Sequence, residues 1–243
     1  MACATPHKII GPVDETSKMM ATQPKVIFFD AVGTLFGVQD GVGATYAKIA
    51  QRHGVTADPE RLEQGFRQSF KRKPAPAFPN IDAELIPKQE FLWWEAIAQE
   101  TFTAAGVIEQ FPDFHAFFTD LYQHFATAEP WFIFTETLAS VQTWHAQGIE
   151  LGLISNFDSR LLQVLDALEL APYFQSVTIS SLTGAAKPDP KIFQTALAKH
   201  RCQPEEALHI GDSRLEDYEA AKRLGMQAHL IERDQPFPYS RQP

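Results

Sequence analysis

The stretch KVIFFDAVGTLFG, residues 25–37, runs through a short apolar segment to an acid and then turns through a glycine and a threonine. A continuous apolar run of this length is typical of a buried strand in a parallel sheet. Gly33 permits the unusual backbone of a tight turn, and the hydroxyl of Thr34 can hold a carboxylate or a phosphate oxygen. We therefore expect Asp30 at the carboxyl end of a strand, where it is available as a nucleophile.

Further apolar runs alternate with segments of helical periodicity along the rest of the chain. The runs cover residues 148–155, 176–180, 207–212 and 225–231. This alternation predicts an α/β fold with a Rossmann-like, mostly parallel sheet. Ligands bind beyond the carboxyl ends of such strands, so one site is expected to collect the polar residues there: Asp30, Ser155, Lys187 and Asp212.

The first and second predicted strands are separated by about a hundred residues without a strand pattern, far more than a crossover connection needs. We expect an inserted α-helical cap domain over residues 38–128. The α/β core is then expected to consist of two parts, residues 25–37 and 129–232.

Three helices are predicted within the cap. The first begins with Asp58 as its N-cap and Pro59 in its first turn, and it places Leu62, Phe66 and Phe70 on one stripe. Two further helices, rich in aromatic residues, are expected over 87–106 and 111–125. Their aromatic residues are interpreted as packing in a hydrophobic core.

The two ends of the chain are expected to lie outside the fold. Residues 1–24 contain neither the apolar core of a signal peptide nor an Arg-rich amphipathic pattern. We interpret them as a disordered N-terminal extension, with Met20 as an alternative start. Residues 233–243 are interpreted as a C-terminal tail.

The composition of the chain argues against several classes of binding partner. The chain has 243 residues, 44% of them hydrophobic, and a formal net charge of −9, which argues against binding to the phosphate backbone of nucleic acids. No apolar run approaches the roughly 20 residues that span a bilayer. Cys3 and Cys202 stand at opposite ends of the chain, so neither a disulfide framework nor a zinc cluster is indicated. A cytoplasmic protein acting on a small molecule is therefore expected.

Four short motifs carry a resemblance to a known family. The segments DAVGTLF, ISNFD, KPDPKIF and GDSRLED occur in the order of the motifs of the haloacid dehalogenase superfamily. The resemblance extends over residues 25–231, and it is to subfamily I, whose helical cap follows the first motif. The cap segments EQGFRQSF, FPN and WW resemble those of the haloacid dehalogenase-like hydrolase domain-containing branch, the relatives of rhythmically expressed gene 2.

The residues and the resemblance together suggest roles in hydrolysis. A carboxylate such as Asp30 can attack phosphorus or an activated carbon. The resemblance implies that Lys187 neutralises both Asp30 and phosphoryl oxygens. Ser155 and Asn156, just past an apolar strand, are expected to donate hydrogen bonds to the substrate. Asp158 is expected to be the N-cap of a helix over residues 159–170.

A magnesium site is expected beside the nucleophile. Asp212 and Asp217 suit a small hard cation that takes oxygen ligands. Asp217 has an alternative role as an acid in the first turn of a helix, where it favours the helix dipole. The resemblance implies that Asp30 and the main-chain carbonyl of Val32 complete the metal site.

The side chain of Val32 departs from the pattern of the superfamily's phosphatases, which usually carry a second Asp there. That Asp protonates the leaving oxygen, a contribution worth about 10² to 10⁴ in rate. We therefore expect a slow magnesium-dependent phosphatase that acts on a small phosphorylated metabolite.

Two alternatives remain open. A 2-haloacid dehalogenase also lacks the second acid, and Arg67 is a candidate for its halide-binding residue. Against this reading, GDSRLED retains the acidic metal motif, and Phe193 stands where dehalogenases usually have Tyr. The other alternative is a non-catalytic protein that binds a phosphometabolite. The basic segment 71–80 is interpreted either as a solvated charge run or as a lid that contacts an anion.

Overall fold

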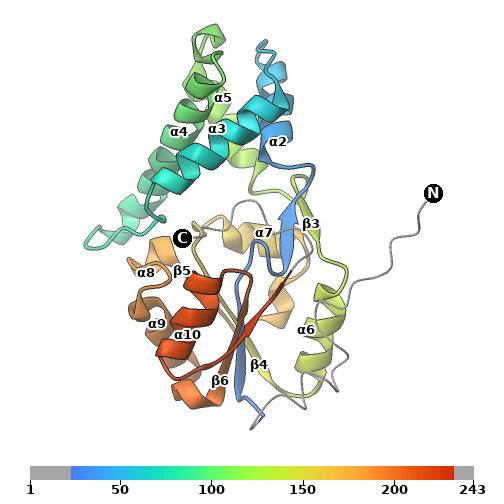
Figure 1. The fold of residues 1–243 in the computed structure, drawn as a ribbon, viewed down its shortest axis with the longest axis vertical. Coiled ribbons are helices and arrows are strands. Elements are labelled where there is room, and N and C mark those ends of the chain that lie inside the picture. Colours follow the sequence, from blue (N-terminus) through green and yellow to red (C-terminus); the bar gives the residue numbers. More distant parts are fainter. Residues whose placement is uncertain (1–22, 233–243) are drawn as a thin grey trace, which may run out of the picture.

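The computed structural model describes residues 23–232 and divides them between an α/β core and a helical cap that stands over it (Figure 1). The core is built on a five-stranded sheet in the order β5-β4-β1-β6-β7, with every neighbouring pair parallel. The strands are β1 (Val26–Phe29), β4 (Glu150–Ser155), β5 (Ser176–Ile179), β6 (Ala207–Gly211) and β7 (Gln227–Leu230). Each corresponds to one of the predicted strands, so the α/β prediction is confirmed.

Strand β1 lies at the centre of the sheet, and its four residues are all buried. It pairs with β4 on one side and β6 on the other, so Phe29 is in register with both Leu153 and Ile210. The next two strands along the chain, β4 and β5, lie on one side of β1, and the last two, β6 and β7, lie on the other side. The strand order therefore reverses at β1. Ligand sites form at the carboxyl ends of strands at such a point.

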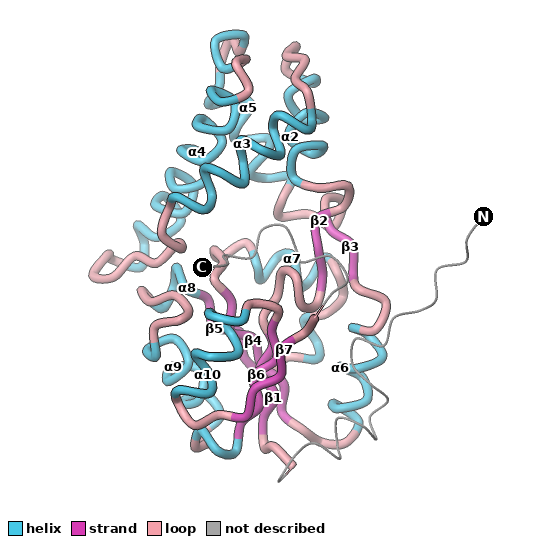
Figure 2. Tube along the Cα trace, viewed as in Figure 1, coloured by secondary structure: helices cyan, strands magenta, loops and turns pink. Residues whose placement is uncertain are grey.

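Helices cover both faces of the sheet (Figure 2). Because side chains alternate between faces along a strand, Ile27 and Phe29 belong to one hydrophobic cluster and Val26 and Phe28 to another. The first cluster includes α6 (Thr137–Ala146) and α7 (Leu161–Ala167), and the second includes α9 (Pro190–His200) and α10 (Ala220–Arg223). Shorter elements complete the core: α8 (Ser180–Thr183), η3 (Ala171–Tyr173), η4 (Pro204–Glu206) and the π-helix η5 (Arg214–Glu219).

The cap is a helical insertion between β1 and β4, as predicted. Its helices are α2 (Val42–Arg52), α3 (Pro59–Arg72), α4 (Ile86–Ala104) and α5 (Phe114–His124), with short turns η1 (Ala83–Leu85) and η2 (Ile108–Gln110). The Asp58 carboxylate accepts a hydrogen bond from the backbone N–H of Glu60 at 2.9 Å, which confirms it as the N-cap of α3.

A two-stranded antiparallel ribbon joins the cap to the core. It pairs β2 (Phe36–Val38) with β3 (Trp131–Ile133), and the segments before and after the cap therefore lie side by side. Sequence periodicity did not predict this ribbon because three-residue strands are too short to show alternation.

Asp158 differs from its predicted role. Helix α7 begins at Leu161, two residues later than an Asp158 cap requires, and its N-cap residue is Arg160. Asp158 does accept a hydrogen bond from the backbone N–H of Arg160 at 3.0 Å. Its remaining contacts, however, are with side chains of Arg160 and of the cap, so tertiary interactions have displaced the capping role.

The predictions on the two ends of the chain concern residues that lie mostly outside the range the structure describes. The proposed extension is described only at residues 23–24, and the proposed tail at residues 233–243 is not described. Within residues 23–232, no helix combines the length and hydrophobicity that crossing a bilayer requires.

Candidate active site

The carboxyl ends of the three central strands meet beneath the cap. Asp30 follows β1, Ser155 ends β4 and Asp212 follows β6. Lys187, from the loop after α8, reaches the same place, and all four residues line one cavity of about 140 Å³ between core and cap. The fold thus brings together the residues that strand-end reasoning grouped.

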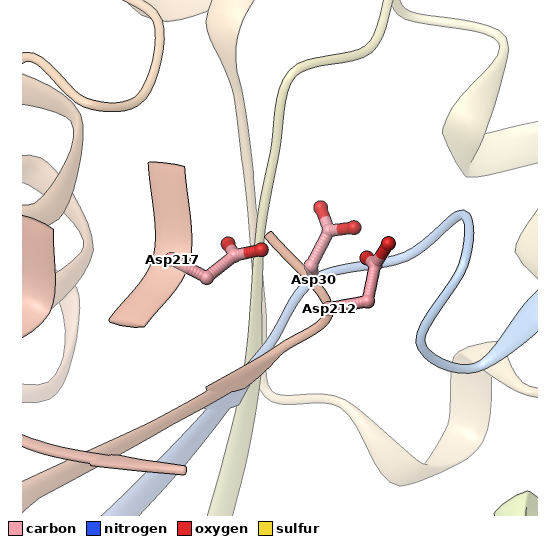
Figure 3. A group of neighbouring side chains, drawn as sticks. All are labelled: Asp30, Asp212 and Asp217. Atoms are coloured by element: carbon pink, nitrogen blue, oxygen red, sulfur yellow. The ribbon is translucent and has the colours of Figure 1, made fainter. Parts of the chain in front are cut away.

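Three carboxylates cluster on the floor of this cavity. One oxygen from each of Asp30, Asp212 and Asp217 lies within 4.8 Å of the others, and Asp30 stands between the other two (Figure 3). Gly33 allows this approach: it has φ of +97°, and a Cβ built there would lie 2.7 Å from an oxygen of Asp212. A side chain at position 33 is therefore excluded both by the backbone conformation and by contact with Asp212.

Lys187 neutralises part of this negative charge. The residue is 3% exposed, and its ammonium donates hydrogen bonds to Asp30 Oδ1 at 2.7 Å and to Asp217 Oδ1 at 2.6 Å. Burial by itself lowers the pKa of Lys187, but the charges of Asp217 and Asp30 outweigh it and hold the pKa above its ordinary value. The ammonium is thus a fixed positive charge beside the strand-end carboxylate.

Asp217 accepts several hydrogen bonds. Besides Lys187, it accepts hydrogen bonds from the His209 ring at 2.8 Å and from the backbone N–H of Ser213 at 3.0 Å. Burial raises its pKa, but Lys187 and then His209 counter this effect and leave the pKa below its ordinary value. The carboxylate therefore stays ionised and acts as an anchor for Lys187.

The pKa of Asp30, unlike that of Asp217, is raised. Burial raises its pKa, the charge of Lys187 lowers it, and the charge of Asp217 raises it again, so that its pKa ends above the ordinary value. A cation placed against this carboxylate would favour the ionised form.

The donor set fits a magnesium ion, since a hard cation takes carboxylate oxygens as ligands. Asp30 and Asp212 are the members of the cluster best suited to bind it directly. Asp217 already satisfies Lys187, His209 and Ser213, so its predicted role as a direct ligand is the less favoured one. The carbonyl of Val32 as a ligand remains a prediction.

Two of the expected substrate-binding residues hold the site's own groups in place. Thr34 is buried and donates to Asp212 Oδ1 at 3.3 Å. The Asn156 amide donates to the carbonyl of Lys187 at 2.9 Å and to Glu216 at 3.2 Å, while its oxygen accepts from the Lys187 backbone N–H at 2.7 Å. Ser155 and Asn156 both line the cavity, whereas Thr34 supports it from behind.

The remaining predicted residues differ in whether they line the cavity. Val32 is half-buried and lines the cavity beside Asp30. Arg67 is not a lining residue; its guanidinium is 47% exposed and pairs with Glu63 at 2.9 Å. In the basic segment 71–80, Arg72 and Lys73 both pair with Glu100, and no residue of the segment lines the cavity. The solvated interpretation of that segment is the one that agrees with these contacts.

The cap closes the cavity with aromatic side chains. The roof includes Phe66, Phe70, Trp94, Phe118, Tyr122 and Phe125. Phe70 stacks on both Phe66 and Trp94, at interplanar angles of 19° in each case. Part of the aromatic density that was interpreted as core therefore faces the cavity instead.

A buried arginine, which sequence reasoning missed, joins this roof to the core. Arg160 forms a bidentate ion pair with Asp158 at 2.8 and 2.7 Å, and its guanidinium lies 3.6 Å from the centre of the Tyr122 ring. It also donates to the Tyr122 carbonyl at 2.8 Å. Trp94 donates its indole N–H to the same Asp158 at 2.6 Å.

Glu90 is a second connection that the sequence did not reveal. It lies on cap helix α4, is fully buried, and accepts hydrogen bonds from Ser159 and Ser181 of the core. An acid inside the apolar pattern of α4 was the available signal, because a buried carboxylate requires partners.

Comparison with known proteins agrees with the geometry. The family model for haloacid dehalogenase-like hydrolases matches residues 24–225. The haloacid dehalogenase-like hydrolase domain-containing protein 3 of Mus musculus is 33% identical, covering 88% of this chain and 84% of its own length. The rhythmically expressed gene 2 protein of Drosophila melanogaster is 30% identical, with 85% and 82% covered.

A solved structure shares the fold at lower identity. The L-2-haloacid dehalogenase of Xanthobacter autotrophicus superimposes with a TM-score of 0.66 at 17% identity, covering 88% of this chain and 79% of that one. The motifs, the helical insertion and the extent of these matches lead to one conclusion: the chain belongs to the haloacid dehalogenase-like hydrolase family.

Proposed function

We propose that this protein is a magnesium-dependent phosphatase of small phosphorylated metabolites, with Asp30 as its nucleophile. The observation that carries the proposal is the cluster of Asp30, Asp212 and Asp217, two of which, Asp30 and Asp217, accept hydrogen bonds from the ammonium of Lys187. A cation bound by carboxylates beside a fixed ammonium provides the positive charge that a phosphoryl group requires.

The chemistry follows from these positions. Asp30 attacks phosphorus, the bond from phosphorus to the leaving oxygen breaks, and its electron pair departs with that oxygen. Water then opens the aspartyl phosphate, releases inorganic phosphate and regenerates Asp30. Lys187 keeps Asp30 oriented and offsets the charge on the phosphoryl oxygens, while Ser155 donates a hydrogen bond to one of them.

Magnesium, when bound by Asp30 and Asp212, would neutralise phosphoryl charge and hold the transferring group in line. Asp217 fixes Lys187, and Thr34 fixes Asp212. Val32 supplies no proton to the leaving oxygen, so turnover is expected to be slow for esters whose leaving group is a poor one.

The test is a titration with magnesium in the presence and absence of beryllium fluoride, a mimic of the phosphoryl group. Each is expected to tighten binding of the other, and Asp212→Ala is expected to abolish the coupling. Asp166→Ala, an exposed acid on α7, is the matched control and should retain it. Independent binding of the two ions in the unaltered protein would contradict the metal assignment.

A 2-haloacid dehalogenase is the second candidate. It is favoured by one observation, the apolar side chain of Val32 beside Asp30, because a halide leaves without a proton. Release of chloride from 2-chloropropionate without magnesium would establish it over the phosphatase. The position of Arg67 outside the cavity gives no support to a halide-binding role for that residue, and Arg67→Ala is expected to leave phosphatase activity within a few-fold.

A further inference from the structure

The cavity has two chemically different ends. The core end carries the acidic cluster and Lys187, whereas the cap end is formed largely by aromatic and aliphatic side chains. A phosphate ester bound with its phosphorus at Asp30 has its leaving group directed to one side of the nucleophile. The available space on the cap side is walled by Phe66, Phe70, Trp94, Phe118 and Phe125.

Several polar groups at the cap end are engaged with one another. The Trp94 indole N–H donates to Asp158. The guanidinium of Arg160 donates two hydrogen bonds to Asp158 and one to the carbonyl of Tyr122. Burial raises the pKa of the Tyr122 phenol, which therefore remains neutral. Tyr46 and Tyr122 also line the cavity, but a leaving group as rich in hydroxyls as a sugar would find few partners there and would lose about tenfold in affinity for each group left unpaired.

The size of the cavity sets a second limit. Its volume is about 140 Å³, and a dry apolar cavity of about 150 Å³ in another protein admits one molecule of benzene. The phosphoryl group occupies part of this space, so the cap side leaves room for a leaving group of no more than about one ring. Flat rings also pack edge-to-face or offset against aromatic walls, a geometry the stacked Phe66, Phe70 and Trp94 side chains present.

Val32 imposes the third limit. It lines the cavity beside the nucleophile and has no proton to give. Outside the carboxylate cluster, Glu216 on the segment that follows β6 also lines the cavity, and it accepts a hydrogen bond from Asn156 at 3.2 Å. An alkyl alcohol departs as a strongly basic oxyanion and needs an acid. A phenol, whose pKa is about 10 as in tyrosine, departs as the phenolate without one.

We propose that the site takes phosphate monoesters of small phenols, that is, aryl phosphates with about one aromatic ring. The ring lies against the cap's aromatic wall and the phosphoryl group on the core. Attack by Asp30 breaks the bond between phosphorus and the aryl oxygen, and the electron pair leaves on the phenolate. Water then opens the aspartyl phosphate, and its two protons end on the phenol and on inorganic phosphate. This inference rests on the phosphatase function proposed above.

A comparison of four substrates in the presence of magnesium tests it. Phenyl phosphate and cyclohexyl phosphate are both apolar and of similar size, but only the first has a good leaving group. Phenyl phosphate is expected to exceed cyclohexyl phosphate by at least about 100-fold in kcat, the lower end of the range that a missing acid costs, with KM values within a few-fold. Glucose 6-phosphate is expected to be the poorest of the three, chiefly through a raised KM.

Acetyl phosphate, the fourth substrate, separates the two proposals. It has an activated leaving group but no ring, so its hydrolysis tests the phosphatase chemistry alone. Turnover of acetyl phosphate with glucose 6-phosphate preferred over phenyl phosphate overturns the aryl assignment and leaves the phosphatase intact. If none of the four is hydrolysed, the phosphatase function itself fails.

A pair of variants adds evidence on where the ring binds. Phe70→Ala removes part of the aromatic wall and is expected to raise the KM for phenyl phosphate about tenfold. Leu92→Ala, on the exposed face of α4, is the matched control and should leave that KM unchanged. An unchanged KM in a folded Phe70→Ala protein would overturn the placement of the ring. The substrate comparison uses the unaltered chain, so it stands even if the Phe70 variant does not fold.

Discussion

Trp94 on the cap donates its indole N–H to Asp158 on the core, at 2.6 Å and across 64 positions of sequence. Asp158 is fully buried and also accepts two hydrogen bonds from the guanidinium of Arg160. One carboxylate of the core therefore bonds both to the cap, through Trp94, and to the core, through Arg160, and so helps to hold the two together. Hydrogen bonds to a charged group are worth about 1.5–3 kcal/mol each, more than those between neutral groups.

The first prediction concerns this bond. Trp94→Phe removes the donor while keeping an aromatic ring, and we expect the free energy of unfolding to fall by about 1.5–3 kcal/mol. The adjacent Trp93 is a matched control: its indole donates to the carbonyl of Pro74 at 3.2 Å in an exposed setting. Trp93→Phe should cost under about 1 kcal/mol. Equal losses for both variants, measured by urea unfolding, would contradict the special role of Asp158.

The second prediction concerns Glu90. Its carboxylate accepts from the hydroxyls of Ser159 and Ser181 and from the backbone N–H of Ser159. Glu90→Gln replaces one acceptor oxygen by an NH₂ group that faces donors, so we expect a loss of about 1–3 kcal/mol in the free energy of unfolding. We also expect faster proteolysis of the segments that join cap and core.

Glu84→Gln is the control for Glu90, because Glu84 lies in the same part of the cap and is exposed. Surface substitutions of this kind usually change stability by no more than about 0.5 kcal/mol. If Glu90→Gln is no less stable than Glu84→Gln, the carboxylate does not hold the cap on the core.

The third prediction is a pH dependence of stability. Burial lowers the pKa of His229 on β7, and burial also lowers that of His124 despite the opposing charge of Glu129. The unfolded chain, in which histidine has a pKa of about 6.5, therefore binds protons more readily than the folded chain. Stability from these residues is complete above that pH and is lost as the pH falls through it.

We therefore expect the free energy of unfolding to decrease between pH 7.5 and about pH 5.5, within the range set by the ordinary histidine pKa. His229→Gln is expected to flatten this decrease in urea unfolding curves measured across the range. A decrease of the same steepness in the variant would show that His229 titrates alike in both states.

The outcome of sequence reasoning differs between the two halves of the site. Asp30, Ser155 and Asp212 were grouped correctly because each follows a buried strand, and parallel strands put their carboxyl ends at one edge. The partnership of Trp94, Asp158 and Arg160 was not predictable, since it joins distant segments without any periodic signal. Asp158 has the local sequence of an N-cap, yet the buried guanidinium and indole provide stronger partners than the helix terminus.

The aromatic residues of the cap illustrate a related limit. Helical spacing correctly placed Leu62, Phe66 and Phe70 on one face of α3. The spacing does not predict whether that face packs in the core or borders a cavity. Leu62 packs inside the protein, whereas Phe66 and Phe70 border the cavity. Only the position of the cap over the sheet distinguishes a core residue from one that borders the cavity.

The last prediction returns to Val32. Val32→Asp introduces a carboxyl group into the cavity that Asp30, Asp212 and Asp217 also line. Like charges and partial burial raise the pKa of a carboxyl group, so the new residue is favoured in its protonated form. A protonated carboxyl is the form that can donate to a leaving oxygen.

For the Val32→Asp protein we expect kcat/KM with cyclohexyl phosphate to rise by about 10² or more, the scale of general acid catalysis. The change with phenyl phosphate should be no more than a few-fold, because a phenolate departs without help. Val32→Asn has nearly the same shape and cannot transfer a proton, so it controls for changes in packing and polarity. A gain in Val32→Asn equal to that in Val32→Asp would assign the effect to the shape of the site. A folded Val32→Asp protein that couples magnesium with beryllium fluoride, yet gains nothing on cyclohexyl phosphate, would mean that the acid is not the missing part.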